Sequence, residues 1–79
     1  MNSERVSLSA LKPGECCIID RLAVTGQMRR RLIDLGFAPG ERVECVGVSP
    51  LGDPHAYCVR CAVIALRRDS AAGIEVLKR

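Results

Sequence analysis

The amino-acid sequence predicts a small, mainly β domain in which short strands close into a barrel that carries one inserted α-helix. Short apolar runs alternate with turn residues, which is typical of strands. Only one segment has a helical period. The length of 79 residues holds a single core, and closure would remove sheet edges that so short a chain cannot cover. Five strands are expected, at residues 15–22, 42–49, 56–61, 63–67 and 74–77.

The inserted helix is expected at about residues 26–36. Met28, Leu32 and Leu35 fall at positions i, i+4 and i+7 and form one narrow apolar stripe. Gly36 is placed to end the helix in a left-handed conformation. The helix therefore lies between the first and second strands and is expected to cover one end or flank of the barrel.

The connecting segments carry weaker signals. Residues 1–7 read as a loose lead-in, and residues 68–72 as a short helical turn. Gly47 interrupts the alternation of the second strand and indicates a bulge there. The third and fourth strands are separated by so few residues that they should pair as a tight hairpin.

Composition narrows the class of function. The formal net charge of +3 permits contact with an acidic partner without requiring nucleic acid. Phe37 and Tyr57 are the only aromatic residues, which argues against stacking of nucleic-acid bases and against capture of proline-rich peptides. Five cysteines, an N-terminus without an apolar signal region and the lack of a membrane-length apolar run predict a cytoplasmic protein.

Catalysis finds little support in the sequence. The chain has one histidine and no nucleophile with a credible base and orienting group. Gly36, Gly40 and Gly52 read as turn glycines, so a glycine-rich phosphate loop is not expected. The sequence therefore predicts a protein that is not an enzyme.

Four motifs in a fixed order resemble the FeoA family, the small cytoplasmic companions of the ferrous iron transporter FeoB. They are RRRLIDLGFAPG at 29–40, SPLGDP at 49–54, ALRR at 65–68 and AGIEV at 72–76. The resemblance spans most of the single domain, residues 1–79. It implies a five-stranded SH3-like barrel with an inserted helix, and a role in bacterial ferrous iron uptake by association with a FeoB-type transporter.

Two features limit what the resemblance implies. A related domain is fused to iron-dependent repressors, so the fold alone does not fix the function. The family often has glycine at the turn between the third and fourth strands, where this chain has Cys61. A side chain there would be strained if that turn needs a positive φ.

The partner-binding hypothesis is a groove between the helix and the loop that follows the second strand. It would accept an apolar element of the transporter while arginines set the orientation. The residues assigned to it are Met28, Arg29, Arg30, Leu32, Leu51, Gly52, Asp53 and Pro54. The alternative is that the apolar residues pack in the core, the arginines are solvated and Asp53 sets a turn. Nucleic acid is not expected as a partner, membrane contact would come only through the transporter, and self-association is left open.

A metal-binding sensor or carrier is the alternative function. Its candidate ligands for zinc or iron are Cys58 and Cys61, which have C-x₂-C spacing, with His55, Cys16 and Cys17. Residues three apart in a strand point to opposite faces, however, and free cysteines are often small buried hydrophobes. No cofactor is therefore expected to be required, and adventitious or weak zinc or iron binding at these residues is the milder alternative.

Overall fold

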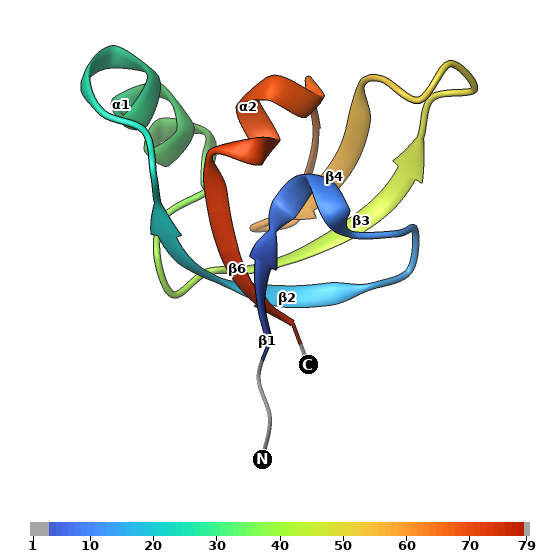
Figure 1. Ribbon diagram of the computed structural model, residues 1–79, viewed down its shortest axis with the longest axis horizontal. Helices are drawn as coiled ribbons and strands as arrows, with labels where there is room; N and C mark the ends of the chain where they lie inside the picture. Colours follow the sequence, from blue (N-terminus) through green and yellow to red (C-terminus); the bar gives the residue numbers. More distant parts are fainter. Residues whose placement is uncertain (1–3, 79) are drawn as a thin grey trace.

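A computed structural model describes residues 4–78 of the chain as one antiparallel sheet with short helices at its margins (Figure 1). The strands are β1 (Glu4–Ser7), β2 (Cys16–Leu22), β3 (Arg42–Val48), β4 (His55–Val59), β5 (Ala62–Leu66) and β6 (Ile74–Lys78). The helices are the 3₁₀ turn η1 (Leu8–Ala10), α1 (Gly26–Leu35) and α2 (Arg68–Ala72). The mainly β class, the inserted helix and the helical turn near 68–72 are thus confirmed.

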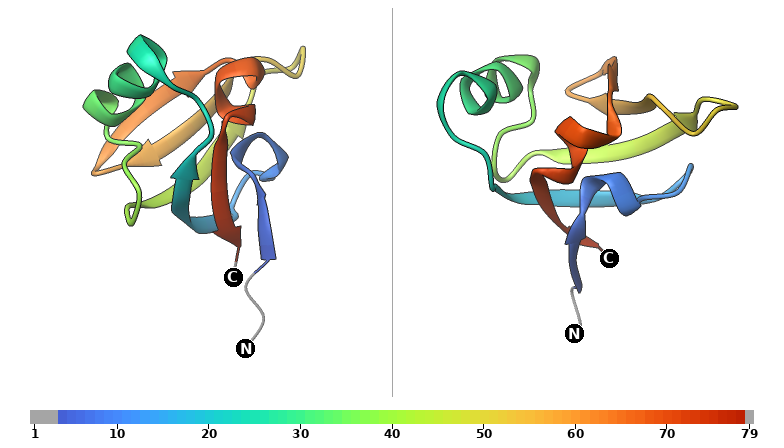
Figure 2. Two further views of the ribbon diagram at one scale, coloured as in Figure 1. Left: turned by 60° about the vertical axis from the view of Figure 1, so that its left-hand side comes forward. Right: turned by 45° about the horizontal axis from the view of Figure 1, so that its top comes forward.

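The sheet has the strand order β1-β6-β2-β3-β4-β5 and bends strongly around its core. The long strand β2 pairs with β6 along most of its length and with β3 at its start, so the sheet turns there. Figure 2 shows α1 at one side of the bent sheet and α2 next to η1, apart from α1. This is the SH3-like arrangement that the sequence predicted.

The predicted strand number and closure are wrong in detail. The described residues contain six strands, and the terminal strands β1 and β5 do not pair with each other. The missed strand is β1, which pairs with β6 from Glu4 opposite Lys78 to Ser7 opposite Glu75. The expected loose lead-in is therefore incorrect for residues 4–7, and residues 1–3 lie outside the described part. Four residues with a single apolar side chain, the partly buried Val6, show too little alternation to predict a strand.

The core lies in the concave side of the sheet and consists mainly of aliphatic side chains around one aromatic pair. Phe37 and Tyr57 are fully buried and meet edge to face, with ring centroids 6.3 Å apart and planes at 89°. Phe37 reaches this position because Gly36 ends α1 with φ 113° and the Phe37 amide returns to the Leu32 carbonyl. The stop of the helix thus places the central aromatic residue.

Two predicted irregularities are present. The register of β3 against β4 shifts between Cys45 and Gly47, which confirms the bulge near Gly47. The β4–β5 connection is a two-residue turn in which Arg60 and Cys61 have φ values of 52° and 66°. Both central residues are therefore left-handed, as in a type I′ turn, although neither is glycine. The turn keeps the geometry for which the family often uses glycine, with Cys61 in a conformation that side chains disfavour.

Candidate functional site

The exposed face of α1 carries part of the predicted partner-binding set. Leu32 is buried, whereas the Met28 side chain is 42% exposed at the start of the same stripe. Arg29 and Arg30 line a shallow hollow that they share with the residues Gly26, Gln27 and Ile33. Leu32 therefore anchors the helix to the core. The side chains of Met28, Arg29 and Arg30 stay accessible on its amino-terminal half.

The loop between β3 and β4 carries the other part. Leu51 is 93% exposed at its tip, so it does not fold back on the core. The loop is held at its base instead. The Gly52 carbonyl lies 3.1 Å from Nε2 of His55, and Oδ1 of Asp53 accepts a 2.8 Å hydrogen bond from the backbone amide of Arg68. Asp53 therefore caps α2 across the sequence, a role beyond the turn-setting one expected for it.

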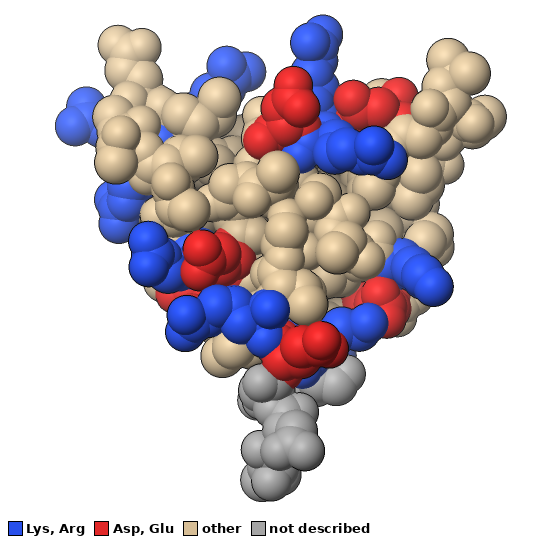
Figure 3. Space-filling view, viewed as in Figure 1, with Lys and Arg blue, Asp and Glu red and all other residues tan. Residues whose placement is uncertain are grey.

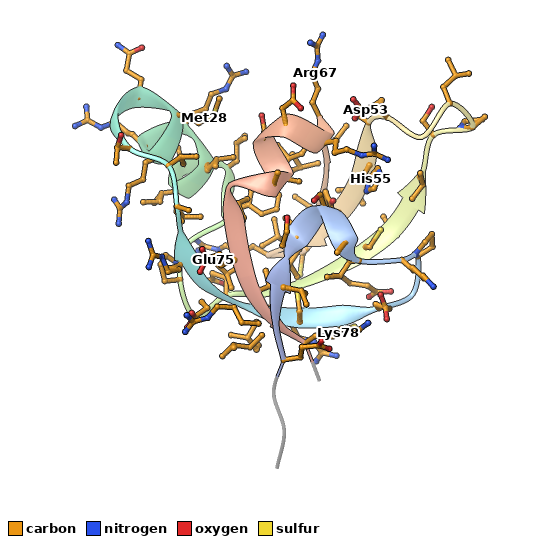
Figure 4. The ribbon with its side chains drawn as sticks, in the orientation of Figure 1. Met28, Asp53, His55, Arg67, Glu75 and Lys78 are labelled. Carbon is orange, nitrogen blue, oxygen red and sulfur yellow. The ribbon has the colours of Figure 1, made fainter. Side chains whose placement is uncertain are left out.

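The α1 face and the loop do not form one groove. Figures 1 and 2 show α1 and residues 49–54 at opposite ends of the molecule, and in Figure 4 Met28 lies far from Asp53. The expected shared groove is therefore incorrect. The α1 face and the loop each expose an apolar side chain, but the strands β3 and β4 carry the loop away from the helix. The two halves are separate surfaces.

His55 is a structural residue of the buried core. Nε2 faces the Gly52 carbonyl and Nδ1 lies 3.2 Å from the Tyr57 hydroxyl, which is also 3.3 Å from the Leu8 carbonyl. The Gly52 carbonyl accepts from Nε2, while the Tyr57 hydroxyl donates its one proton to the Leu8 carbonyl and lies within hydrogen-bond distance of Nδ1. Burial raises the pKa of the Tyr57 hydroxyl, so it stays protonated and remains a donor. Both ring nitrogens of His55 are thus engaged by the protein.

The five cysteines are free and divided between two environments. Cys17 and Cys45 point into the core, and burial raises the pKa of the Cys17 thiol to about 12. Cys16 lies on the outer side of β2, where Nη2 of Arg42 approaches its sulfur to 3.7 Å. The neighbouring thiols Cys16 and Cys17 therefore diverge, as the strand geometry predicted.

Cys58 and Cys61, the predicted metal ligands with C-x₂-C spacing, lie on a common surface. Together with Arg60 they line a shallow hollow at the β4–β5 turn, whose other residues are Glu41, Arg42 and Glu44. Among the described residues, no group of three or more His, Cys, Asp or Glu side chains is placed to hold a metal ion. The predicted set is thus dispersed: His55 and Cys17 lie in the core, while Cys16, Cys58 and Cys61 lie outside it.

Charge on the face shown in Figure 3 is spread rather than gathered in one patch. On the face shown in Figure 3, cationic and acidic side chains lie side by side. Three ion pairs account for part of this pattern, namely Arg5–Asp20, Arg21–Glu75 and Lys78–Glu15. The hydrogen bond from Lys78 lowers the pKa of Glu15, and the same contact raises the pKa of Lys78.

One accessible feature escaped the sequence analysis, namely the outer edge of β5. Val63 is 68% exposed, and the adjoining Ala62 and Ala65 are exposed as well. The signal in the sequence was an uncharged run between Arg60 and Arg67. It could not be interpreted, because only the strand order shows that this run is an edge.

Comparison with known proteins identifies the family. The model of the FeoA domain matches residues 6–78. The chain belongs to the FeoA family. A curated relative, the Fe(2+) transport protein A/Fe(2+) transporter FeoB fusion protein of Porphyromonas gingivalis, is 38% identical over 69 residues. These residues are 87% of this chain but only 8% of the relative, so the chain corresponds to a small part of that protein.

Solved FeoA structures share the fold. Iron(II) transport protein A from Clostridium thermocellum has a TM-score of 0.89 and 42% identity over 92% of this chain and 45% of its own. The FeoA of Stenotrophomonas maltophilia, described as a procaryotic SH3 domain protein and solved with zinc, has a TM-score of 0.79 and 29% identity. That match covers 90% of this chain and 88% of the relative. The FeoA family takes part in ferrous iron transport. Within the described residues, no helix is long and apolar enough to cross a bilayer.

Proposed function

We propose that this FeoA domain is a non-catalytic accessory protein of ferrous iron uptake that acts by binding a FeoB-type transporter. The observation that carries the proposal is the fused relative, in which a domain 38% identical to this chain shares one polypeptide with the transporter. Two domains joined in one chain are held at high effective concentration, which favours a contact between them. A separate chain that makes the same contact must bind through its own surface.

The surface of the domain is suited to such a contact. Leu51, Met28 and Val63 are exposed apolar side chains on segments that the core holds in place. Arginines lie close to two of them in the sequence, Arg29 and Arg30 directly after Met28 and Arg60 three residues before Val63. Exposed apolar side chains next to guanidinium groups are the usual composition of protein interfaces. The transporter's cytoplasmic portion is the proposed partner, which places the domain in the cytoplasm.

The proposal is tested by binding and by transport. The chain should co-purify with the FeoB-type transporter of its own organism, and its removal should change uptake of radioactive ferrous iron in cells. Leu51→Asp and Met28→Asp make the same apolar-to-acidic change at opposite ends of the molecule, so their comparison shows which end the transporter contacts. Wild-type protein that folds but neither binds the transporter nor affects uptake would overturn the proposal.

Metal binding is proposed only as a weak property of the β4–β5 turn. The zinc complex of the Stenotrophomonas maltophilia relative shows that a FeoA can hold this ion. Here Cys58 and Cys61 supply two thiols on a common hollow, which leaves half of a tetrahedral zinc shell to water. We expect weak zinc binding that Cys58→Ser abolishes without loss of the fold. Native mass spectrometry of protein purified without added metal measures it, and one tightly held ion per chain would contradict this assignment.

A further inference from the structure

The outer edge of β5 presents unpaired backbone groups. Among the described residues, no strand lies beyond β5 in the sheet. The two-residue turn at 60–61 makes Val59 and Ala62 the hydrogen-bonded pair next to it. Because such pairs alternate along an antiparallel ladder, the N–H and C=O groups of Val63 and Ala65 point away from β4. These four groups form a template for one more strand.

The side chains along this edge allow another backbone to approach. Val63 and Ala65 lie on the outer face of the sheet, opposite Cys58 and Ala56 of β4. Ala65 also lines a shallow, mostly apolar hollow that continues across the neighbouring strands, with Gly47, Val48, Ser49, Pro54, His55 and Ala56. An added strand would therefore meet small apolar side chains on the outer face and Ile64 on the inner one.

Charge selects the kind of segment that fits. The five residues of β5 are uncharged, whereas Arg60 stands before the strand and Arg67 and Arg68 follow it, all three exposed. Among the described residues, none of these guanidinium groups lies within ion-pair distance of a carboxylate, because the ion pairs involve other arginines. An extended segment with an apolar middle and an acidic residue at each end would place its carboxylates beside these cations.

A second copy of the chain fits this edge poorly. Antiparallel pairing of two β5 strands about Ile64 would bring the turn that carries Arg60 of each copy to the segment after β5 that carries Arg67 and Arg68 of the other. Like charges gathered at both ends of such a pair repel each other. The charges that favour an acidic partner therefore oppose self-pairing.

We infer that the transporter is held at this edge, by adding an extended segment with an apolar middle and acidic ends to the sheet as a strand beside β5. Strand addition of this kind obtains affinity from main-chain hydrogen bonds and selectivity from the side chains at alternate positions. The inference rests on the proposed function, because it assigns the segment to the transporter. It deepens that function by naming the strand and the chemistry of the segment.

Amide hydrogen exchange tests the pairing directly. The probe is the detergent-solubilised FeoB-type transporter of the same organism, added to the isotope-labelled chain during exchange. The chain is then released from the complex, and NMR measures how far each amide has exchanged. We expect the Val63 and Ala65 amides to exchange at least about tenfold more slowly in the complex. The Ala62, Ile64 and Leu66 amides already face β4 and should change less. This alternating pattern distinguishes strand addition from simple coverage of the surface.

Substitutions test the same edge by affinity. Val63→Pro removes one outward N–H and leaves the ladder with β4 intact, so it should weaken transporter binding at least about tenfold. Val63→Thr keeps that N–H and should stay within about threefold of wild type. Arg60→Glu and Arg67→Glu should each weaken binding, with an effect that shrinks at high salt. Lys12→Glu makes the same charge change on the loop before β2 and is their control.

The outcomes separate this inference from the proposed function. If the transporter binds while the β5 amides stay unprotected and Arg60→Glu behaves like Lys12→Glu, the inference is overturned and the proposed function stands. If the wild-type chain does not bind the transporter, both are overturned. Should Val63→Pro fail to fold, the exchange pattern and the arginine variants still decide.

Discussion

The two edges of the sheet are built differently. The β1 edge is short and polar, and Nη2 of Arg5 lies 2.8 Å from Oδ2 of Asp20. Its neighbour β6 is fixed by Lys78, whose Nζ lies 2.8 Å from Oε2 of Glu15. The β5 edge has no charged residue along its five positions and exposes most of the Val63 side chain.

The difference shows how one small sheet treats its two edges. Charged side chains on an edge strand discourage pairing with other chains, whereas an uncharged edge invites it. The β1 edge is thus protected by its own composition, and the β5 edge is not. An unprotected edge is a liability unless a partner uses it, which is why we assign a binding role to β5.

Tyr57→Ala should have the largest effect, because Tyr57 is the buried support of the β5 end. It packs against Phe37, and its hydroxyl reaches the Leu8 carbonyl. We expect a loss of about 4 kcal/mol in the free energy of unfolding, measured by urea denaturation. Tyr57→Phe keeps the ring and should cost only about 1–2 kcal/mol for the unpaired Leu8 and His55 groups. Equal costs for the two variants would show that the ring does not support this end.

Gly73→Ala tests the packing of the β1 end, since Gly73 precedes β6. A Cβ there would lie 2.5 Å from Cγ1 of Val24, a stiff β-branched side chain. We expect destabilisation of about 1–3 kcal/mol by overpacking, measured by thermal unfolding. Gly47→Ala is the matched control in β3, where a Cβ meets open space, and should change stability by less than about 0.5 kcal/mol. A neutral Gly73→Ala would mean that this end is loosely packed.

Asp53→Ala tests the link between the β3–β4 loop and α2. Loss of the cap on the Arg68 amide should destabilise the chain by about 1 kcal/mol. Asp53→Asn retains an acceptor oxygen and should lower the free energy of unfolding by only about 0.3 kcal/mol. Urea denaturation measures both. If the two variants lose the same amount, the carboxylate charge rather than the hydrogen bond carries the effect.

Exchanging charged and apolar side chains between the two edge strands tests whether charge protects the β1 edge from pairing. Val63→Lys gives β5 a charge like that of β1, and Arg5→Val gives β1 an apolar edge like that of β5. Each should change the free energy of unfolding by less than about 1 kcal/mol, because both positions are exposed. We expect Val63→Lys to lower and Arg5→Val to raise association at high protein concentration, measured by light scattering. The opposite order would contradict the protective role of charge on these edges.

The Glu15–Lys78 pair should have the smallest effect, visible as a dependence on pH. The pKa of Glu15 is lowered by Lys78, so its contribution is present above the ordinary value of 4.5 and is lost as the pH falls through the lowered value. The pKa of Lys78 is raised, so its contribution is present below 10.5 and is lost as the pH rises through the raised value. The melting temperatures of wild type and Glu15→Gln should therefore differ at pH 7 and converge once the pH falls below the lowered pKa of Glu15. A difference in melting temperature that persists in acid would show that the packing of the Glu15 side chain, and not its charge, causes the difference.

Much of the fold was predictable because it is written in local signals. Gly36 ends α1 and Gly47 marks the bulge, as their positions in the periodic runs indicated. Strand β1 was missed because a four-residue strand draws its stability from β6, seventy residues along the chain. Partners of this kind leave no local pattern.

The candidate site was less predictable, because it depends on which elements become neighbours. Met28 and Leu51 are both exposed, although the sequence left open whether each packs in the core, and nothing in their local sequence shows that they lie at opposite ends. The thiols of Cys58 and Cys61 share a hollow only because the turn carries Cys61 out of the strand. His55 looked like a metal ligand because its hydrogen-bond partners are visible only in three dimensions.

The pairing of Glu4 with Lys78 has a consequence for how the domain can be attached to another polypeptide. The two described ends of the chain leave from one corner, at the bottom of Figure 1, while α1 and the loop at 49–54 lie at the top. A tether attached at either terminus would hang the domain from that corner. In a larger polypeptide the domain could then reorient about that attachment point, and β5 and Leu51 would stay accessible, as they are in the separate domain.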